Sequence, residues 1–502
     1  MPHCNSICHP AAFRAKREKN AVNKALSLVL SLLLSLPVSL PALGRTNDLN
    51  LPDFGDTSSG IVSYQEEKRL GQLFMRSYRA QVPTSDDPLL INYLRELIGR
   101  LAQHSQLNNR NFELIIAENA SMNAFAAPGN VIGVHTGLFT YSQNEAQLAS
   151  VLTHELAHLS QRHYARRLEQ QRNMTIPFYT ALLASLVLAA SGSDGGIAAM
   201  AATQAAAADA SLRFSRQNEQ EADRLGIDTL IDAGYDPYAA PDMFEQMLRA
   251  SRYSRRPPDF LLTHPVTESR VADARARAMR YPRNGNTQDS LDFQLMNARV
   301  QVLQAENAQQ AVDIFKSELA GDNHTPEASR YGLALAYSKM GDAEAGAKAL
   351  APLLKQDPNR LVYQVMDIDI DLAAKRYDTA LKKLRTGLQH LPNYYPFNVR
   401  YAEALMNSGH YQSGAEFLSQ YVRKDTEDPY MWYLLAEVSG LAGDVLGVHE
   451  ARAEYFIQVG VYDRAIVQLR NALKLAPKDK HRSAILQERL RYVERLLSEL
   501  DF

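Results

Sequence analysis

A repeat with a period of 34 residues constrains the fold of the second half of this 502-residue chain. Five turn-forming segments start 34 residues apart, at positions 307, 341, 375, 409 and 443. Breaks before proline, as at Asp357-Pro358 and Asp428-Pro429, separate the repeats. A further turn-like segment starts at Gly460 and does not follow the 34-residue period. Units of this length cannot bury an apolar face alone, so they stack into a solenoid of helix pairs.

This period is that of the tetratricopeptide repeat, in which each of these segments forms the turn between two helices. From about residue 290 onward the chain is rich in alanine, leucine, tyrosine and polar residues and has no strand-like runs. We therefore expect residues 290–502 to form an α-solenoid whose last repeat is irregular or a cap. Its concave face is expected to bind other proteins.

A second motif, His154-Glu155-Leu156-Ala157-His158, lies in the first half of the chain. Positions i and i+4 of a helix share one face, so both imidazoles can bind a single zinc ion. Glu155, one step round the helix, is placed to act on a metal-bound water. Leu148, Val151 and Leu152 supply an apolar stripe that buries such a helix. The alternative is a buried helix with two hydrogen-bonded histidines.

Two histidines and a water leave one protein ligand of zinc to be found. One class of zinc peptidase has a third histidine six residues after the motif, but Tyr164 stands there. Glu219, Glu221 and Asp223 are the remaining candidates. Glu219 and Asp223 are four residues apart on one helical face, so one can bind zinc while the other orients a ligating histidine. This spacing favours Glu219 over Glu221 as the ligand.

Short elements are predicted before the metal motif. Apolar residues recur at helical spacing over 63–81 and 87–106. Three strand-like runs follow, at 112–116, 124–126 and 131–135. Pro128-Gly129-Asn130, between the second and the third, is a turn signal. We predict a small antiparallel sheet beside the metal helix. Its outer strand either holds an extended polypeptide by main-chain hydrogen bonds or is an ordinary structural hairpin.

After the metal motif the chain becomes strongly apolar. Residues 176–190 form a continuous apolar run, and residues 197–210 are mostly alanine, with a serine- and glycine-rich segment between them. We expect a helical hairpin inserted at 174–212, each arm too short to span a bilayer. It either packs on the rest of the protein or presents an apolar surface to a membrane or a client protein. The surrounding residues, 45–285, are expected to form an α+β domain.

The first 44 residues have the order of a secretory signal peptide. Basic residues precede an apolar run at 25–36, and small residues end near Gly44. The run is too short to span a membrane. Both cysteines lie in this segment, so neither disulfides nor thiolates support the exported chain. Residues 45–502 carry 49 basic and 55 acidic residues, a net charge of −6, which argues against a nucleic-acid partner.

Taken together, the motifs resemble the zinc metallopeptidase family of HtpX and the CAAX prenyl protease. The matching segments are the metal helix, Glu219-x-x-x-Asp223, Asn123-Ala124-Phe125-Ala126-Ala127-Pro128-Gly129 and Thr263-His264-Pro265. The resemblance covers residues 60–280 and implies a gluzincin-like fold with one zinc ion per chain. It implies that His154, His158 and Glu219 are the three metal ligands. It also implies that Glu155 is the catalytic base and that Asp223 is the orienting carboxylate.

With its signal peptide and repeats, the chain is also similar to the periplasmic β-barrel assembly-enhancing proteases of Gram-negative bacteria. This resemblance implies a periplasmic zinc endopeptidase that degrades misassembled outer-membrane proteins and assists β-barrel assembly. Its expected partners are unfolded outer-membrane proteins and the β-barrel assembly machinery, with peripheral membrane contact as a further expectation. The alternative is an assembly chaperone or scaffold with a latent, rarely used protease activity.

His264 has two candidate roles in this site. Pro265 restricts the backbone of the residue before it and stiffens the loop. His264 then either donates to the oxyanion or occupies the open position of zinc and keeps the enzyme latent. The alternative is a loop histidine hydrogen-bonded to the backbone. His135 and His163 are expected to have no role in the site.

Overall fold

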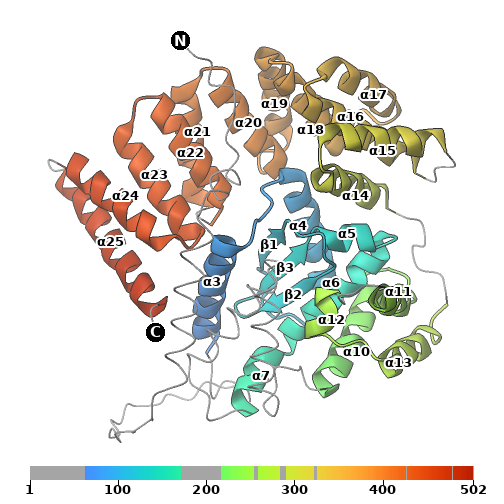
Figure 1. The fold of residues 1–502 in the computed structure, drawn as a ribbon. Coiled ribbons are helices and arrows are strands. Elements are labelled where there is room, and N and C mark those ends of the chain that lie inside the picture. The colour runs from blue at the N-terminus through green and yellow to red at the C-terminus, as the bar shows by residue number, and fades with distance from the viewer. Residues whose placement is uncertain are drawn as a thin grey trace, which may run out of the picture. The chain divides into compact units, whose positions relative to one another are not determined.

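The computed structural model describes residues 63–170, 216–253, 258–282, 290–321, 325–425, 427–476 and 479–500. The predicted signal peptide and the predicted apolar hairpin lie outside these residues. Figure 1 shows one small sheet among helices, followed by a long array of helix pairs, as predicted. None of the helices described in these ranges combines the length and the apolar character that crossing a bilayer requires.

Two helices precede the sheet, α3 (Tyr64–Gln81) and α4 (Pro88–Gln103), close to their predicted bounds. Side chains cap both N-termini: Ser63 Oγ accepts from a backbone N–H of α3, and Asp87 Oδ1 accepts from two backbone N–H groups of α4. α4 buries its leucines completely and forms part of the main hydrophobic core. The N-caps therefore define where both helices begin, and the buried leucines anchor α4 in the core.

The sheet consists of β1 (Glu113–Ala117), β2 (Ala124–Ala127) and β3 (Val131–His135) in the order β1-β3-β2. β2 and β3 pair antiparallel across the predicted turn, in which Gly129 and Asn130 both have positive φ. β1 and β3 pair in parallel. The predicted antiparallel sheet is therefore wrong for this pair, because the third strand lies between the first two and runs in the same direction as the first.

The metal motif lies on α6 (Glu145–Ser160), which follows the short α5 (Gly137–Tyr141) and is buried from Glu145 to His158. The helix α7 (His163–Gln170) comes next, and then α10 (Arg216–Asp232) packs along α6. Gly226 permits this close packing, since a Cβ on it would lie 3.1 Å from His154 Cα. The remaining helices of this domain are α11 (Ala239–Tyr253), α12 (Asp259–Thr263) and α13 (Glu268–Ala278).

Six helix pairs follow in the described part of residues 291–500. They are α14 (Leu291–Gln304) with α15 (Ala308–Ala320), α16 (Pro326–Met340) with α17 (Ala343–Gln356), α18 (Leu361–Ala373) with α19 (Tyr377–His390), α20 (Tyr395–Asn407) with α21 (Tyr411–Lys424), α22 (Pro429–Leu441) with α23 (Val445–Gln458), and α24 (Tyr462–Leu475) with α25 (Lys480–Leu500). All five predicted turns lie between the two helices of a pair, as the period required.

The turns have the backbone conformations that their residues favour. Gly341, Gly409 and Gly443 have φ of 83°, 83° and 81°, in the left-handed region that glycine adopts without strain. Gly460, with φ of 70°, joins α23 to α24. This turn therefore connects two repeats instead of two helices of one repeat, which explains why it is out of step. The last pair has no glycine turn and ends in a 21-residue helix, as predicted for an irregular repeat.

The repeats share buried contacts with the first domain. Phe139 of α5 stacks on Phe293 of α14, with ring centroids 6.2 Å apart, and both rings are fully buried. Arg299 Nε of α14 donates to Asp87 Oδ2 over 2.6 Å. At the other end of the array, Arg76 of α3 donates to the Tyr492 hydroxyl of α25 over 3.2 Å. Figure 1 shows these two helices near one another. The two parts of the chain are thus packed as one body from residue 63 onward.

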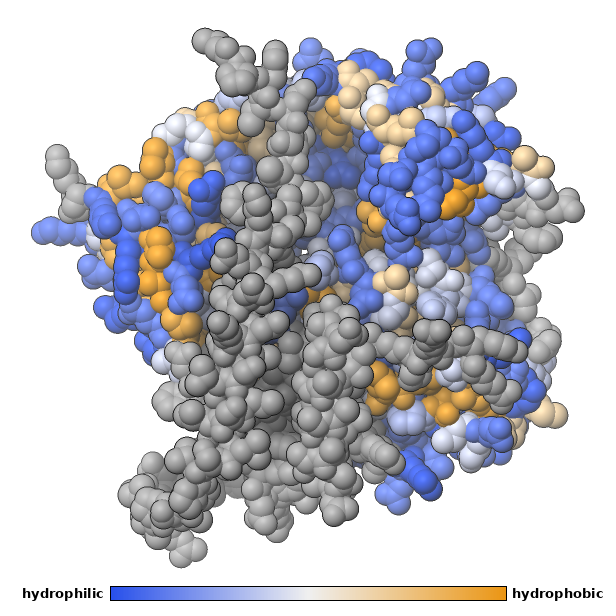
Figure 2. Space-filling model, in the orientation of Figure 1, coloured by the Kyte–Doolittle hydropathy of each residue, from blue (hydrophilic) through white to orange (hydrophobic). Residues whose placement is uncertain are grey.

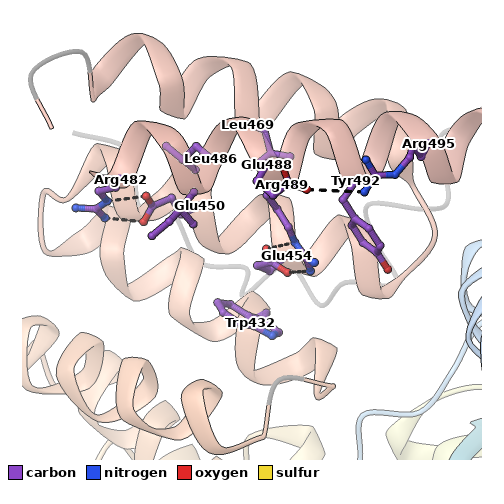
Figure 3. A pocket seen from close by; sticks show the side chains of 11 residues that line it. Trp432, Glu450, Glu454, Leu469, Arg482, Leu486, Glu488, Arg489, Tyr492 and Arg495 are labelled. Atoms are coloured by element: carbon purple, nitrogen blue, oxygen red, sulfur yellow. Dashed lines mark hydrogen bonds and ion pairs between the residues drawn. The ribbon is translucent and has the colours of Figure 1, made fainter. Parts of the chain in front are cut away.

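A cavity of about 700 Å³ lies among α22, α23, α24 and α25. Figure 3 shows Trp432 on one side of it, and two ion pairs across it, Arg482 with Glu450 and Arg489 with Glu454. Apolar side chains of these repeats are also exposed to solvent, among them Val445, Val467, Leu475 and Ile485. Figure 2 shows orange patches over this part of the molecule. Contiguous exposed apolar patches are typical of surfaces that bind proteins.

Candidate metal centre

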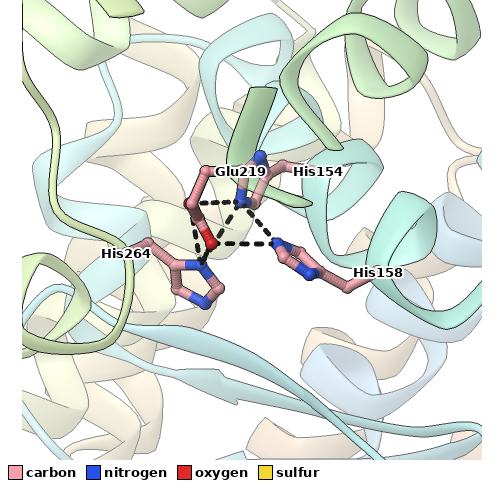
Figure 4. Close-up of side chains that lie close together, drawn as sticks. All are labelled: His154, His158, Glu219 and His264. Atoms are coloured by element: carbon pink, nitrogen blue, oxygen red, sulfur yellow. Dashed lines mark hydrogen bonds and ion pairs between the residues drawn. The ribbon is translucent and has the colours of Figure 1, made fainter. Parts of the chain in front are cut away.

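Four side chains from three separate segments converge on one point (Figure 4). His154 and His158 come from α6, Glu219 from the first turn of α10, and His264 from the C-terminal end of α12. All four are at least 96% buried. One ligand atom from each lies within 4.8 Å of the others, so the group is able to hold a metal ion. The two histidines of the motif and the favoured acid are therefore brought together.

The spacing of these atoms suits tetrahedral zinc. His154 Nε2 lies 3.1 Å from His158 Nε2 and 3.6 Å from Glu219 Oε2, and Glu219 Oε1 lies 3.5 Å from His158 Nε2. Donor atoms that surround zinc at its usual bond lengths of about 2.0–2.1 Å lie roughly 3.3 Å apart. His264 Nδ1 lies 3.4 Å from His154 Nε2 and 3.1 Å from Glu219 Oε1. It therefore stands where a fourth donor would.

The carboxylate of Glu155 lies on the same helix as the two motif histidines. The side chain is fully buried, and neither of its oxygens has a hydrogen-bond partner among the described residues. His264 Nε2 lies 3.5 Å from Glu155 Oε1. A buried polar group without a partner costs free energy, so such a group calls for a functional explanation. A base that acts on a water at the metal is such an explanation.

His154 is held from behind by Asp223. His154 Nδ1 lies 3.0 Å from Asp223 Oδ1, which leaves Nε2 to face the other donors. Arg270 donates to both oxygens of Asp223 over 2.7 Å and lies 2.9 Å from Glu219 Oε2. Arg270 also donates to Pro265 O over 2.8 Å, so one guanidinium ties both carboxylates to the loop that carries His264. Such partners fix the orientation of metal ligands.

The electrostatics suit a metal ligand set. Burial alone lowers the pKa of His154, but the carboxylates of Asp223 and Glu219 raise it to about 9. Burial alone raises the pKa of Glu219, but His264 and the two motif histidines hold it well below its usual range. Burial and the neighbouring His154 lower the pKa of His158. Glu219 is therefore ionised and His158 neutral, the forms in which these groups bind metals, whereas His154, with its raised pKa, gives up a proton when a metal binds.

His158 has its own chain of partners, which sequence reasoning missed. His163 Nδ1 lies 2.9 Å from His158 Nδ1, and His163 Nε2 lies 3.2 Å from Glu221 Oε2. Arg166 donates to the same oxygen of Glu221 over 2.9 Å. His163, expected to have no role, therefore touches a member of the site, whereas His135 contacts Tyr78 and Ser121 instead. The five-residue spacing to His158 was the only signal for His163.

Arg270 was also missed. It follows the Thr263-His264-Pro265 segment by five residues, and nothing in the spacing marks it as a partner of Asp223. The loop histidine itself is placed by local contacts: the backbone N–H of His264 donates to Phe260 O over 2.8 Å, and the ring stacks on the Phe260 ring with centroids 4.7 Å apart. The side chain of His264 thus points into the site, where its Nδ1 contacts site residues and not the backbone expected in the alternative.

Comparison with known proteins agrees with this arrangement. Peptidase family M48 matches residues 88–278, and the tetratricopeptide repeat matches residues 371–438. The chain is 35% identical over 423 residues to the β-barrel assembly-enhancing protease of Escherichia coli (strain K12), which covers 84% of this chain and 86% of that protein. It is 33% identical over 427 residues to a putative β-barrel assembly-enhancing protease of Vibrio cholerae, covering 85% and 88%.

A more distant relative matches a smaller share of the chain. The chain is 29% identical over 214 residues to the mitochondrial metalloendopeptidase OMA1 of Schizosaccharomyces pombe, which covers 42% of this chain and 60% of that protein. These matches confirm the resemblance noted from the motifs and identify the chain as a metalloprotease with a repeat domain. The chain belongs to the family of β-barrel assembly-enhancing proteases, metallopeptidases of family M48 that carry tetratricopeptide repeats.

Proposed function

We propose that this metalloprotease is a zinc-dependent endopeptidase of the bacterial periplasm, exported by the signal peptide at residues 1–44. It degrades misassembled outer-membrane proteins and assists β-barrel assembly. The name of its relatives, β-barrel assembly-enhancing protease, supports the substrate class. The peptidase domain spans residues 45–285, and the repeats at 290–502 recruit unfolded outer-membrane proteins and the β-barrel assembly machinery.

One observation carries the enzymatic part of this proposal. His154, His158 and Glu219 converge at zinc-ligand spacing, and the carboxylate of Glu155, which has no hydrogen-bond partner among the described residues, lies on the same helix as the two histidines. A structural metal site needs no such group, because it is closed by four ligands and has no water to activate. A buried carboxylate without a hydrogen-bond partner next to three donors is instead the arrangement of a hydrolytic zinc site.

The side chains of the site then have distinct tasks. When bound, zinc lowers the pKa of a coordinated water to about 7 and polarises the peptide carbonyl. Glu155 takes the proton of the attacking water and returns it to the leaving amine. Asp223 holds His154 with Nε2 facing inward, and Arg270 holds Asp223. Burial of all of these groups excludes bulk water, which strengthens each electrostatic contact.

His264 favours the second candidate function, an assembly scaffold whose protease is latent. Its Nδ1 stands where the fourth donor of tetrahedral zinc would, and its Nε2 faces Glu155. A neutral imidazole in this position excludes the water that Glu155 would activate. We therefore propose that the described arrangement is the resting form, and that movement of the loop between α12 and α13 opens the site for catalysis.

The cavity at the end of the repeats supports partner recruitment (Figure 3). Its apolar side chains and paired charges are able to hold a polypeptide segment, and more apolar groups are exposed close by in sequence. Peripheral membrane contact remains part of the proposal through the apolar residues 174–212, whose amphiphilic composition suits a membrane surface.

Metal content and proteolysis of the purified mature protein test the proposal. We expect about one zinc per chain and cleavage of an unfolded outer-membrane protein that stops when Glu155 is changed to Gln. Comparison of Glu155→Gln with a deletion of the last two repeats in cells separates the two candidate functions. If β-barrel assembly survives Glu155→Gln but not the deletion, the scaffold role dominates.

A further inference from the structure

The partner chain behind His158 differs in kind from the one behind His154. His154 contacts a carboxylate directly, whereas His158 contacts a second histidine, which contacts a carboxylate in turn. His163, the intervening residue, is fully buried, and both of its ring nitrogens are within hydrogen-bond distance of a partner. Glu221, the carboxylate at the end, is oriented by Arg166. The contacts form one continuous line from His158 to Arg166.

When both rings are neutral, only one arrangement of protons satisfies every contact in this line. An ionised carboxylate only accepts, so Glu221 takes the N–H of His163 Nε2. The neutral ring of His163 then has a lone pair on Nδ1, and this accepts the N–H of His158 Nδ1. His158 is left with its lone pair on Nε2, the atom that faces His154 and Glu219. The line of contacts therefore selects the tautomer of His158.

The backbone is strained where it produces this contact. Arg162, between α6 and α7, has a φ of 48°, in the left-handed region that is unfavourable for a residue with a Cβ. Its side chain is fixed by Glu67 at 3.1 Å and by the Tyr64 ring, whose centroid lies 4.5 Å from Arg162 Cζ. The turn at Arg162 brings His163 back against His158, so the strained backbone produces the contact between these two rings.

We infer that His163 and Glu221 are positioning residues that hold His158 as an Nε2 metal ligand, in parallel with the action of Asp223 on His154. This inference rests on the proposed zinc site and extends it. It also changes the role of Glu221, which the helical spacing had only set against Glu219 as an alternative ligand. Both acids serve the site: Glu219 faces the metal directly, and Glu221 acts through His163.

Zinc affinity and the visible absorption of the cobalt-substituted full-length protein test the inference. His163→Phe keeps a ring but removes the acceptor for His158, so zinc affinity, measured by competition with a chelator, should fall about 10–100-fold. The cobalt spectrum should shift, because one ligand loses its fixed tautomer. His163→Asn should recover most of the loss, since its amide oxygen can accept near the position of Nδ1. Glu221→Gln should lose less than about tenfold, because an amide still accepts from His163.

His135→Phe is the matched control. It removes another buried histidine from the same domain, but His135 contacts Tyr78 and Ser121 and no member of the site. It should lower the stability of the fold and leave zinc affinity and the cobalt spectrum unchanged. If His163→Phe does not fold, Glu221→Leu takes its place, since the side chain of Glu221 is 27% exposed and tolerates change better.

Parent-like zinc affinity and an unchanged cobalt spectrum in His163→Phe or Glu221→Leu would overturn the inference. Failure of the proposed function looks different. In that case the parent protein itself binds no zinc, or Glu155→Gln remains fully active. A parent that binds zinc tightly and loses activity only in Glu155→Gln, with His163 variants unaffected, would uphold the peptidase and remove the positioning role of His163.

Discussion

At the scale of single residues, the site assigns different work to acids that look alike in the sequence. Glu155 is fully buried without a hydrogen-bond partner among the described residues, whereas Glu219 is surrounded by three imidazoles. The first is therefore suited to proton transfer and the second to holding a cation. Substitutions that distinguish zinc binding from activity can separate the two roles.

Glu155→Gln should keep zinc and lose about 10²–10⁴-fold in peptidase rate, because it removes the base and no ligand. Glu219→Ala should lose zinc and activity together. Metal analysis of both purified variants, beside a peptide cleavage assay, checks this. Zinc retained at the parent level in Glu219→Ala would contradict the ligand assignment.

His135 gives a prediction about stability and pH. Burial lowers the pKa of His135 to about 4, although Asp259 acts in the opposite direction. Unfolding raises this pKa to about 6.5, so between pH 4 and 6.5 the unfolded chain binds more protons than the folded one. The stabilisation is therefore complete above about pH 6.5 and is lost as the pH falls to 4, an effect of up to about 3 kcal/mol.

His135→Phe should flatten this part of the stability curve, whatever it does to stability at pH 7. Urea unfolding of parent and variant at intervals between pH 4 and 7 measures the difference, and the contributions of other histidines cancel in it. A difference that stays constant over this range would show that His135 is not held neutral in the folded protein.

At the scale of elements, the distance between α6 and α10 determines whether the site can form. Gly226 faces α6 one and two turns beyond Asp223 and Glu219, and a Cβ there would lie 3.1 Å from both N and Cα of His154. Contacts this short require one helix to move by a few tenths of an ångström. A movement of this size at Gly226 displaces the two acids from the two histidines.

Gly226→Val should therefore lower zinc retention strongly, with Gly226→Ala intermediate, as measured by chelator competition. Gly99→Ala on α4 is the control, because a Cβ there has no atom within 4 Å. It should be neutral or stabilise the fold by about 0.5–1 kcal/mol through helix propensity. Equal zinc retention in Gly226→Val and Gly99→Ala would mean that the helix spacing does not control the site.

His264, at the loop between α12 and α13, gives a prediction in which its two candidate roles change the cleavage rate in opposite directions. If His264 occupies the fourth position at rest, His264→Ala should keep zinc and cleave an unfolded protein faster than the parent. If His264 instead donates to the oxyanion, the same variant should be slower by about 10²–10³-fold. Rates at equal zinc occupancy decide between these roles, and an unchanged rate would exclude both.

At the scale of the whole molecule, a ladder of buried charges joins the two domains. It starts at Asp87, the N-cap of α4, and passes to Arg299 of α14. Asp369 of α18 and Arg400 of α20 continue it, and Glu403 ends it by accepting from the Tyr430 hydroxyl of α22 over 2.6 Å. Beyond Asp87, the members lie on the first helices of four of the six pairs, α14, α18, α20 and α22, so the ladder runs along the array from the peptidase domain.

Asp87→Asn should weaken the coupling of the two domains. The amide keeps the cap of α4 but leaves the buried Arg299 without its nearest charge, a loss of about 3–5 kcal/mol. Trp432 is the only tryptophan of the chain and reports on the repeats, while zinc release reports on the peptidase domain. In the parent both signals should change together in urea, and in Asp87→Asn zinc release should come first.

Glu494→Gln is the control for this experiment, since its pair with Arg470 is exposed and such pairs contribute about 0–1 kcal/mol. The ladder would have no coupling role if the two signals still coincided in Asp87→Asn at nearly unchanged stability.

The sequence alone determined the features that depend on local periodicity. The 34-residue period predicted the helix pairs and their turns, because each turn needs a residue that tolerates or favours its backbone conformation. The i, i+4 spacing put His154 and His158 on one face, and the same spacing selected Glu219 and Asp223. These patterns repeat within a few residues, so no tertiary contact is needed to read them.

Only the tertiary structure decided which distant segments meet. The sheet is mixed because β3 lies between β1 and β2. The alternation of apolar residues along a strand does not depend on strand order, so it cannot predict that order. Arg270 and His163 belong to the site through packing of α13 and of the turn at Arg162, contacts that no spacing rule contains. The shared core of the two domains has the same origin: Phe139 and Phe293 are 154 positions apart in sequence, yet their rings stack. Burial of such pairs depends on the whole fold, because an apolar residue alone does not specify its partner.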